Sequence, residues 1–576
     1  MEQLYLYCKK ADFNQISGQF NISPILARIL VNRDIPESDM EEYLYGDVNS
    51  MADPFLMKDM ERAVNVITDC LAANGKIMVV GDYDVDGVCS GYILETYLNF
   101  LGADVSVRLP NRITDGYGLN ENMVRDFAEN GVNLIITADN GISASPAALT
   151  AKELGIKLVV TDHHQIPVTL PEADAVIDPK QEDCTYPFKE LCGAAVAYKL
   201  VKALESRLDA DKKLQSEKLT DELLQFAGMA TIADIVPLKG ENRIFAKEGI
   251  KRLRTTSNIG LKALYEVRSL DPAIISSYHI GFVLGPCINS AGRLKDASLA
   301  LSLLKETDYS KALKTAGELA ELNEVRKDMT AKQISEAGKL IEEMGDNPDK
   351  VVVLYLPEAH ESVAGIVAGK IKDDLNRPVI VLTNSAEGYK GSGRSTDAYN
   401  MIEELSAHPE LFAKFGGHAK AAGFTLKVHY DEMRKVLNES CTMTDEDMVR
   451  KIWLDMPLPL NYITEELVEE IKLMEPFGMG NQRPSFGERD VEVLNFNVYG
   501  RLNNVLKLSL RTKDGHRVDG VYFAPEEKIA EYQEQLTAKK QAGEPVKVTF
   551  AYYPSINEFR GMKTPQAVIT FLKISE

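Results

Sequence analysis

The chain of 576 residues exceeds what one hydrophobic core usually supports, so we expect several domains. Its 45% hydrophobic and 26% charged content is typical of a globular protein and excludes a disordered or membrane-embedded chain. The net charge of -21 speaks against a surface that is basic throughout, but a nucleic-acid groove needs only a local positive stripe.

Two sequence features indicate the compartment in which the protein works. The opening residues, MEQLYLYCKKADF, lack the basic start and the apolar run of a signal peptide, and no later run is apolar over the length of a membrane span. The 7 cysteines contain no C-x-x-C pair, which argues against both a disulfide framework and a structural zinc site. We therefore expect a cytoplasmic protein that has no membrane partner.

Four short apolar runs between Lys76 and Asp178 predict the first domain. The runs KIMVVGDYD, VNLIITADNG, IKLVVTDHH and ADAVIDPK each lead into an aspartate. They alternate with helical stretches such as VCSGYILETYLNFLG and SASPAALTAKELG, which is typical of a parallel sheet covered by helices on both faces. Ligands bind outside the carboxyl ends of such strands, so we expect the acidic turns to meet at one edge.

The rest of the chain predicts a connector and two further domains. Apolar residues at helical spacing from about Ser310 to Met344 indicate a long connecting helix. The runs VVVLYLP and PVIVLTN then begin a second, smaller α/β domain. The segments VEVLNFNVYG, VLKLSLRT, HRVDGVYFA, VKVTFAYYP and QAVITFLKI predict a small β-barrel of the OB type. The predicted fold class is therefore α/β, with a C-terminal β-barrel.

The first acidic turn, DYDVDG, crowds Asp82, Asp84 and Asp86 into one short loop. Carboxylates this close repel one another, and folding raises the pKa of at least one of them unless a cation lies between them. The motif matches the opening of an EF-hand calcium loop, but the twelfth position, which needs glutamate, is Ile93. A solvated acidic turn is the other alternative, and it is disfavoured because further acids and histidines lie at the same predicted edge.

The third turn, VVTDHHQIP, places Asp162, His163 and His164 directly after a predicted buried strand. A lone histidine is more often a packed or surface residue than a ligand, but two in series that face an acidic loop favour a metal site. Carboxylates with one or two imidazoles suit Mn²⁺ or Mg²⁺. The acids are too numerous for one ion, so we predict two ions that share a bridging carboxylate and activate water for attack on a phosphoryl group.

The motifs GDYDVDG, TADNG, TDHH and ATIADIVPL follow one another as motifs one to four do in the DHH phosphoesterase superfamily, which the chain resembles. Within it, LPNRITDGYGL, CINSAGRL, GSGRS, FGGHAKAAGF and EPFGMGNQRP are similar to further motifs of the RecJ family of bacterial exonucleases. The resemblance covers nearly the whole chain. It implies a two-metal exonuclease that degrades single-stranded DNA from 5′ to 3′ to mononucleotides, in recombination and repair.

The resemblance also assigns residues at the metal site. Asp139 would bridge the two ions, His164 would contact the scissile phosphate or its leaving oxygen, and Asp162 would orient the neighbouring imidazole. For Asp178, a cap of the turn before Pro179 and a functional role are equally compatible with the sequence. The implied metal ligands are Asp82, Asp84, Asp86, Asp139, His163 and Asp234.

Two glycine-rich loops, GSGRS and FGGHAKAAGF, are candidates for phosphate binding. Exposed backbone N–H groups in such loops can approach a phosphate, and a guanidinium can clamp it, whereas the alternative is a pair of tight turns. The resemblance implies that Arg112, Ser392 and Arg394 hold the 5′ end of the strand and that Arg293 follows it. In the second loop the candidates are Gly417 and His418.

In the predicted barrel we expect one or two aromatic side chains to stack on DNA bases, as in other OB folds. Most aromatic residues in alternating strands belong to a core, so the choice among them stays open. Lys507, Arg511 and Lys513 either follow phosphates or form a solvated face. The candidates for stacking are Tyr499, Tyr522, Phe523, Tyr552 and Tyr553.

We expect five segments: an N-terminal segment that packs on the core (1–55), the DHH catalytic domain (56–300), the connector helix (301–347), the DHH-associated domain (348–440) and the OB domain (441–576).

Two other functions compete with a polymer exonuclease. A phosphodiesterase for short oligonucleotides or cyclic dinucleotides usually needs only the two α/β domains, and a catalytically dead scaffold would carry degenerate ligands. We expect the protein to be a monomer. Its expected partners are single-stranded DNA, a single-strand-binding protein and a helicase.

Overall fold

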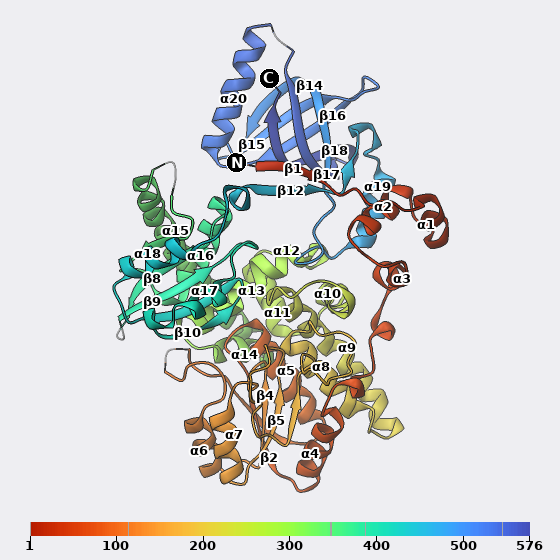
Figure 1. The fold of residues 1–576 in the computed structure, drawn as a ribbon. Coiled ribbons are helices and arrows are strands. Elements are labelled where there is room, and N and C mark those ends of the chain that lie inside the picture. Colours follow the sequence, from red (N-terminus) through yellow and green to blue (C-terminus); the bar gives the residue numbers. More distant parts are fainter. Residues whose placement is uncertain (1, 113, 346–347, 386–387, 544, 576) are drawn as a thin grey trace. The chain divides into compact units, whose positions relative to one another are not determined.

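A computed structural model describes residues 2–112, 114–345, 348–385, 388–543 and 545–575 of the chain (Figure 1). The chain divides into two compact units. The larger unit contains Ala52–Val236 and Glu248–Arg450, and the smaller contains Met1–Met51, Pro237–Lys247 and Lys451–Glu576. No helix in the described part of the chain combines the length and the apolar character that a membrane crossing requires.

The larger unit begins with a parallel five-stranded sheet in the order β3-β2-β4-β5-β6. Helices α6 and α7 pack on one face, where Phe127 and Ala148 join a cluster with Ile135 and Val160. Helices α4, α5 and α8 contact the other face. The elements are α4 (Met60–Ala72), β2 (Lys76–Val80), α5 (Val85–Phe100), β3 (Asp104–Arg108), α6 (Glu121–Glu129), β4 (Leu134–Ala138), α7 (Ser145–Glu153), β5 (Lys157–Thr161), β6 (Ala175–Ile177) and α8 (Gly193–Glu205).

The four predicted strands are β2, β4, β5 and β6, so the predicted parallel sheet is confirmed. The sheet has one more strand than predicted, β3, which lies at its edge. Strand β3 is only partly buried, so its sequence lacks the continuous apolar run that marks the other strands.

A helical region leads from this sheet to the next. The connector α15 (Tyr309–Glu343) is a single helix of 35 residues over the stretch predicted from about Ser310 to Met344, and it buries Ala316 and Leu319 on one stripe. It begins at Asp308, whose side chain accepts hydrogen bonds from the first backbone N–H groups. The preceding elements are α9 (Ala210–Ala233), α10 (Gly240–Leu253), α11 (Ile259–Val267), α12 (Ser277–His279), a π-helical turn (Ile280–Leu284), α13 (Gly285–Leu294) and α14 (Ser298–Lys305).

A second five-stranded sheet, in the order β10-β11-β9-β8-β7, completes the larger unit. Strands β7 and β8 are parallel, as expected of an α/β domain, whereas β9, β10 and β11 continue the sheet antiparallel. The elements are β7 (Val352–Tyr355), α16 (Glu361–Leu375), β8 (Val379–Ser385), β9 (Gly388–Arg394), α17 (Met401–Ala407), β10 (Phe412–His418), β11 (Ala421–Leu426) and α18 (Tyr430–Ser440).

The smaller unit contains the predicted barrel. Its strands follow the order β13-β14-β15-β16-β18-β17, and pairing of β14 with β17 closes the sheet. Helix α20 (Glu526–Gln541) lies between β16 and β17, where no helix was predicted. Helices α1 (Phe13–Phe20), α2 (Pro24–Asn32) and α3 (Glu37–Tyr45) share the apolar core of the barrel. The strands are β13 (Met456–Pro457), β14 (Phe486–Tyr499), β15 (Val505–Arg511), β16 (Arg517–Phe523), β17 (Lys547–Phe559) and β18 (Met562–Ile574).

Candidate metal centre

The carboxyl ends of β2, β4 and β5 bring the acidic turns together. Asp84 begins α5, because its side chain accepts hydrogen bonds from the backbone N–H groups of Asp86 and Gly87 at 2.9 and 3.2 Å. Asp139 follows β4 in the left-handed region, with a φ of 65°, which aspartate tolerates better than most residues. Asp234 ends α9 as its C-cap. Each predicted ligand therefore stands where a strand or helix begins or ends.

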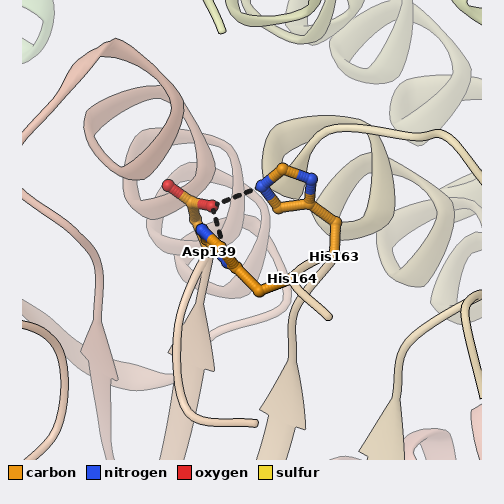
Figure 2. A group of neighbouring side chains, drawn as sticks. All are labelled: Asp139, His163 and His164. Atoms are coloured by element: carbon orange, nitrogen blue, oxygen red, sulfur yellow. Dashed lines mark ion pairs between the residues drawn. The ribbon is translucent and has the colours of Figure 1, made fainter. Parts of the chain in front are cut away.

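The imidazole nitrogens of the two histidines lie close to the carboxylate oxygens of the predicted ligands. His163 Nε2 lies 3.1 Å from Asp139 Oδ1, 3.6 Å from Asp86 Oδ2 and 3.7 Å from Asp234 Oδ2. His164 Nδ1 lies 4.0 Å from the same Asp139 oxygen. Figure 2 shows both imidazoles turned toward that carboxylate. The cluster is thus organised around Asp139 and His163.

Three groups of side chains have donor atoms within 4.8 Å of one another among the described residues. One joins Asp139, His163 and His164, a second joins Asp86, His163 and Asp234, and the third joins Asp82, Asp84 and Asp139. Asp139 and His163 each belong to two groups. The six predicted ligands therefore form one continuous cluster, in which the groups overlap at these two residues.

The buried carboxylates repel one another. The pKa of Asp139 lies well above its usual value, first because burial penalises the charged form and then because Asp86 and Asp84 are negative. Burial followed by the charge of Asp84 raises the pKa of Asp86 to about 6. Burial also comes first for Asp82 and Asp234, whose pKa values are raised well above normal. So much negative charge in one buried pocket favours binding of a cation.

Two observations show that a metal ion fits this cluster. They are the buried oxygen atoms without a hydrogen bond and the chemistry of the side chains that would bind the ion. Asp82 Oδ1 and Asp139 Oδ1 are buried and accept no hydrogen bond from the described residues. Burial, then the charge of His164, lowers the pKa of His163 to about 3, so this imidazole is neutral, as a metal ligand must be. Carboxylates with a neutral imidazole match the preference of Mn²⁺ and Mg²⁺. The residues present fit the two ions that the sequence predicted.

His164 differs from its neighbour. Its Nδ1 lies 2.7 Å from Asp162 Oδ1, and this hydrogen bond and charge raise the pKa of His164 although burial alone would lower it. Burial would by itself raise the pKa of Asp162, but the hydrogen bond and charge of His164 and the N–H of Ile142 outweigh it and lower that pKa. Asp162 and His164 therefore form a hydrogen-bonded pair next to the predicted ligands.

Sequence reasoning missed three groups that shape this site. The backbone N–H groups of Gly193 and Ala194, at the start of α8, donate to the two oxygens of Asp86 at 2.6 and 2.7 Å. The hydroxyl of Tyr117 donates to the carbonyl of Asp139 at 3.1 Å and lies 3.3 Å from the His164 ring. Asn289 accepts from the N–H of Val85. Tyr117 and Asn289 lie in the quoted motifs DGYGL and NSAGR, which were the available signal.

The structure supports the capping role of Asp178. Its Oδ1 accepts from the backbone N–H of Lys180 at 2.8 Å, and its other oxygen is buried without a hydrogen bond from the described residues. Burial raises the pKa of Asp178 to about 7. Asp178 is absent from the three donor groups found among the described residues.

Three of the predicted phosphate contacts are arginines that lie near one another. Burial, then the charge of Arg112, lowers the pKa of Arg293 to about 10, and Arg394 contributes to the same shift. Burial, then Arg112, lowers the pKa of Arg394 as well. Arg293 Nη1 also donates to the carbonyl of Ser362 at 2.8 Å, at the start of α16. Clustered guanidinium groups repel one another unless an anion binds between them.

The remaining phosphate candidates lie on strands, Ser392 on β9 and Gly417 and His418 on β10, and not in the glycine-rich loops that the sequence predicted. Arg112 and Ser392 line a cavity of about 340 Å³ together with Gly416. Gly417 has a φ of 146°, and a Cβ there would lie 2.3 Å from the carbonyl of Ala421, so the pairing of β10 with β11 explains this glycine. Burial, then the charge of His164, lowers the pKa of His418.

The five aromatic candidates in the barrel divide between its core and its surface. Tyr552 and Tyr522 are buried, whereas Tyr499 and Phe523 are 52% and 59% exposed. The ring of Tyr553 contacts the guanidinium of Arg483. The three candidate cations pair with carboxylates: Lys507 with Asp519, Arg511 with Glu492 and Lys513 with Glu488.

Comparisons with known proteins agree with this architecture. The model of the DHH family N-terminal domain matches residues 76–231, that of the DHHA1 domain matches 349–443, and that of the RecJ OB domain matches 454–570. The solved structure of RecJ from Thermus thermophilus in complex with Mn²⁺ is similar, with a TM-score of 0.82, 26% identity and coverage of 100% of this chain and 80% of that one. The same protein in complex with Mg²⁺ has a TM-score of 0.76, with coverage of 100% and 79%.

Two curated relatives cover nearly the whole chain. The single-stranded-DNA-specific exonuclease RecJ of Bacillus subtilis is 36% identical over 97% of this chain and 69% of its own length. The Haemophilus influenzae protein of the same name is 34% identical over 97% of both chains. Together with the three family models, these similarities show that the chain belongs to the RecJ family of single-stranded-DNA-specific exonucleases.

Proposed function

We propose that this exonuclease hydrolyses single-stranded DNA from its 5′ end to mononucleotides, in recombination and repair, and that the acidic cluster is its active site. The observation that carries the proposal is the overlap of three donor groups at Asp139 and His163. Groups of ligands that overlap at two residues suit two neighbouring ions better than a single ion. The proposed ligands are Asp82, Asp84, Asp86, Asp139, His163 and Asp234, with Asp139 as the bridge.

Bound Mn²⁺ or Mg²⁺ supplies Lewis-acid polarisation of the phosphoryl group and activates water. The protein supplies the preorganised ligands. The N–H groups of Gly193 and Ala194 fix both oxygens of Asp86, so this carboxylate does not need to reorient when an ion binds. His163 stays neutral and keeps a lone pair for a metal.

His164 is the proposed acid next to the scissile phosphate. Asp162 holds its Nδ1 and, with Asp86 and Asp82, raises its pKa, so the ring carries a proton over more of the neutral range than a free imidazole does. A protonated imidazole can donate a hydrogen bond to a phosphate oxygen or a proton to the leaving oxygen. Asp162 acts as a positioning residue, because it accepts hydrogen bonds from both the ring and the backbone of His164.

The arginine cluster is the proposed anchor for the 5′ phosphate. Arg112 and Arg394 are near enough to perturb one another, and Ser392 shares a cavity with Arg112. A phosphate dianion between them would relieve the repulsion and accept charge-assisted hydrogen bonds. Arg293, whose pKa responds to Asp84 as well as to Arg112, is the proposed contact to the strand between anchor and metals. His418 remains a further proposed contact.

A phosphodiesterase for short oligonucleotides or cyclic dinucleotides is the second candidate. It uses the same cluster, but the match to a RecJ OB domain over residues 454–570 favours a polymer substrate. A catalytically dead scaffold is disfavoured, because each of the predicted ligands is present and lies in the cluster.

The deciding experiment compares substrates with Mn²⁺ present. Single strands labelled at the 5′ or the 3′ end, their duplexes and a cyclic dinucleotide are digested in parallel, with Asp139→Asn as the control for contaminating nucleases. We expect early release of the 5′ label from single strands only, and a loss of at least about a hundredfold in Asp139→Asn. Preferred hydrolysis of the cyclic dinucleotide would instead identify the second candidate, and early release of the 3′ label would reverse the polarity.

Other expectations from the sequence stay predictions. We keep the five segment boundaries as a proposal, supported by the separate matches to three family models. Because DNA is the substrate of the family, we propose that the protein works in the cytoplasm. We also propose that the protein is a monomer and that its partners are a single-strand-binding protein and a helicase.

A further inference from the structure

Three aromatic rings gather on a two-stranded ribbon of the smaller unit. Strand β1 (Glu2–Leu6) pairs with β12 (Arg450–Leu454), as Figure 1 shows, and the N–H of Tyr7 donates to the carbonyl of Leu454 at 3.1 Å. The ring centroid of Trp453 lies 4.8 Å from that of Tyr7 in a stacked arrangement and 5.2 Å from that of Tyr5. We call Tyr5, Tyr7 and Trp453 the aromatic ribbon.

The rings of Tyr7 and Trp453 in the aromatic ribbon stack on each other and still face solvent. Trp453, the single tryptophan of the chain, is 44% exposed, and Tyr7 is 36% exposed. Large aromatic side chains in a core are buried almost completely, as Tyr552 is in the barrel. A solvent-facing stack of this kind presents π-faces on which further planar groups can bind.

Cations lie near the aromatic ribbon although the chain is acidic overall. The ammonium group of Lys451 lies 5.8 Å from the ring centroid of Tyr5, and Lys10 lies shortly after β1, whereas Lys9 pairs with Asp34. Tyr5 also lines a groove of about 600 Å³, to which Arg489 contributes together with the ion pair of Lys513 and Glu488. Cations beside exposed rings complement a phosphate backbone that carries bases.

We propose that the aromatic ribbon is a binding surface for single-stranded nucleic acid, in which Trp453 and Tyr7 stack on bases while Lys451 and Arg489 contact phosphates. It differs from the sequence-based expectation, which placed base stacking on the strands of the barrel. The inference rests on the proposed function, since an exonuclease for long strands gains from a second contact with its substrate.

Trp453 allows a test that needs no substitution. As the single tryptophan, it reports its own environment, and stacking of bases on it quenches its fluorescence. With a chelator present to stop hydrolysis, we expect oligothymidylate to quench the fluorescence of the parent protein saturably. Free thymidine at the same concentrations should leave the fluorescence unchanged. Unchanged fluorescence at saturating strand, with binding seen by anisotropy, would overturn the proposal.

Substitutions then separate stacking from packing. Trp453→Leu keeps an apolar side chain on the ribbon but removes the π-face, and we expect it to weaken binding of dye-labelled oligothymidylate by about five- to a hundredfold. Tyr462→Leu is the matched control, because Tyr462 is an exposed aromatic of the same unit at 52% and should leave binding unchanged. Lys451→Glu alters charge without removing a ring and should weaken binding more at low salt than at high salt.

The outcomes distinguish this inference from the proposed function. Equal affinity of the parent and Trp453→Leu, with hydrolysis by the parent in Mn²⁺, would refute the ribbon and leave the exonuclease intact. Binding at Trp453 without any hydrolysis would do the reverse. If Trp453→Leu fails to fold, as judged by thermal unfolding, the fluorescence of the parent and the salt dependence of Lys451→Glu decide the question.

Discussion

Asp162 accepts hydrogen bonds on both oxygens, from the N–H of Ile142 at 2.9 Å and from the His164 ring at 2.7 Å. An amide at this position offers one acceptor oxygen and adds an N–H₂ donor, so it cannot satisfy both partners in the same way. The residue therefore determines which nitrogen of His164 is protonated and where the ring points.

We predict that Asp162→Asn lowers kcat on single strands by about ten- to a hundredfold while the bound Mn²⁺ stays the same. The reason is loss of the His164 orientation and of the charge that raises the pKa of His164. Turnover is measured together with metal content. The pH at which activity is lost on the alkaline side should be lower in the variant than in the parent. Loss of metal in step with activity would instead make Asp162 a ligand.

Arg394 gives a second prediction at this scale. Arg394→Ala should reduce kcat/KM on strands with a 5′ phosphate by about ten- to a hundredfold, because a charge-assisted contact is lost. Strands with a 5′ hydroxyl should be affected least, and Arg394→Lys should restore only part of the activity, because a point charge cannot reproduce the bidentate fork. Steady-state kinetics on both strands at low ionic strength make the comparison. An equal loss on both would assign Arg394 to the strand in general or to the fold.

At the scale of elements, the start of α8 does the most to position the acids. Its first N–H groups bind Asp86, and Gly193 packs against Asp139, where a Cβ would lie 2.5 Å from the Cβ of Asp139. A helix N-terminus also carries partial positive charge, which stabilises the neighbouring carboxylate. The helix therefore fixes two predicted ligands from different turns, Asp86 in the first turn of α5 and Asp139 directly after β4.

Gly193→Ala should reduce Mn²⁺ affinity at least about tenfold, because the added methyl group displaces Asp139. The matched control is Gly338→Ala in α15, where a Cβ has no neighbour within 4 Å. That change should stabilise the protein by about 0.5 to 1 kcal/mol and leave metal binding unaltered. Calorimetric titration with Mn²⁺ and thermal unfolding measure both variants, and equal Mn²⁺ affinity in both would mean that α8 adapts to the methyl group.

On the scale of the whole molecule, the acidic cluster couples metal binding to stability and pH. Asp86 has a pKa of about 6 in the folded chain against 3.8 for an ordinary aspartate, so the metal-free folded state holds its proton more tightly than the unfolded state does. The stabilisation from this proton is complete below about pH 3.8 and is lost as the pH rises through about 6. Metal ligation requires the deprotonated form.

We therefore predict that the increase of Tm caused by Mn²⁺ grows between about pH 5 and about pH 8, because the metal-free protein loses stability while the ligands become available. Thermal unfolding with Mn²⁺ or with a chelator across this range measures the difference. Asp139→Asn should flatten the dependence, since it removes one of the repelling charges. A Mn²⁺ effect in the parent that stays constant over the same range would contradict the linkage.

The sequence by itself determined the elements whose signal is local. Strands β2, β4, β5 and β6 are continuous apolar runs because a parallel sheet is buried on both faces, and α15 has apolar residues at helical spacing, although its buried stripe includes Asn323 and Gln333. The aspartates at strand ends followed from the same pattern. The structure brings those predicted ligands together, and their roles stay predictions.

Only the tertiary structure decided features that depend on residues far apart in sequence. Strand β3 was missed because it is half-buried at an edge, and α20 was missed between two strands of the barrel. Local periodicity could not show that Tyr552 is buried while Trp453 stays exposed, because burial depends on which segments pack together. Pairing of β1 with β12 joins segments from distant parts of the sequence, so the aromatic ribbon exists only in the folded chain.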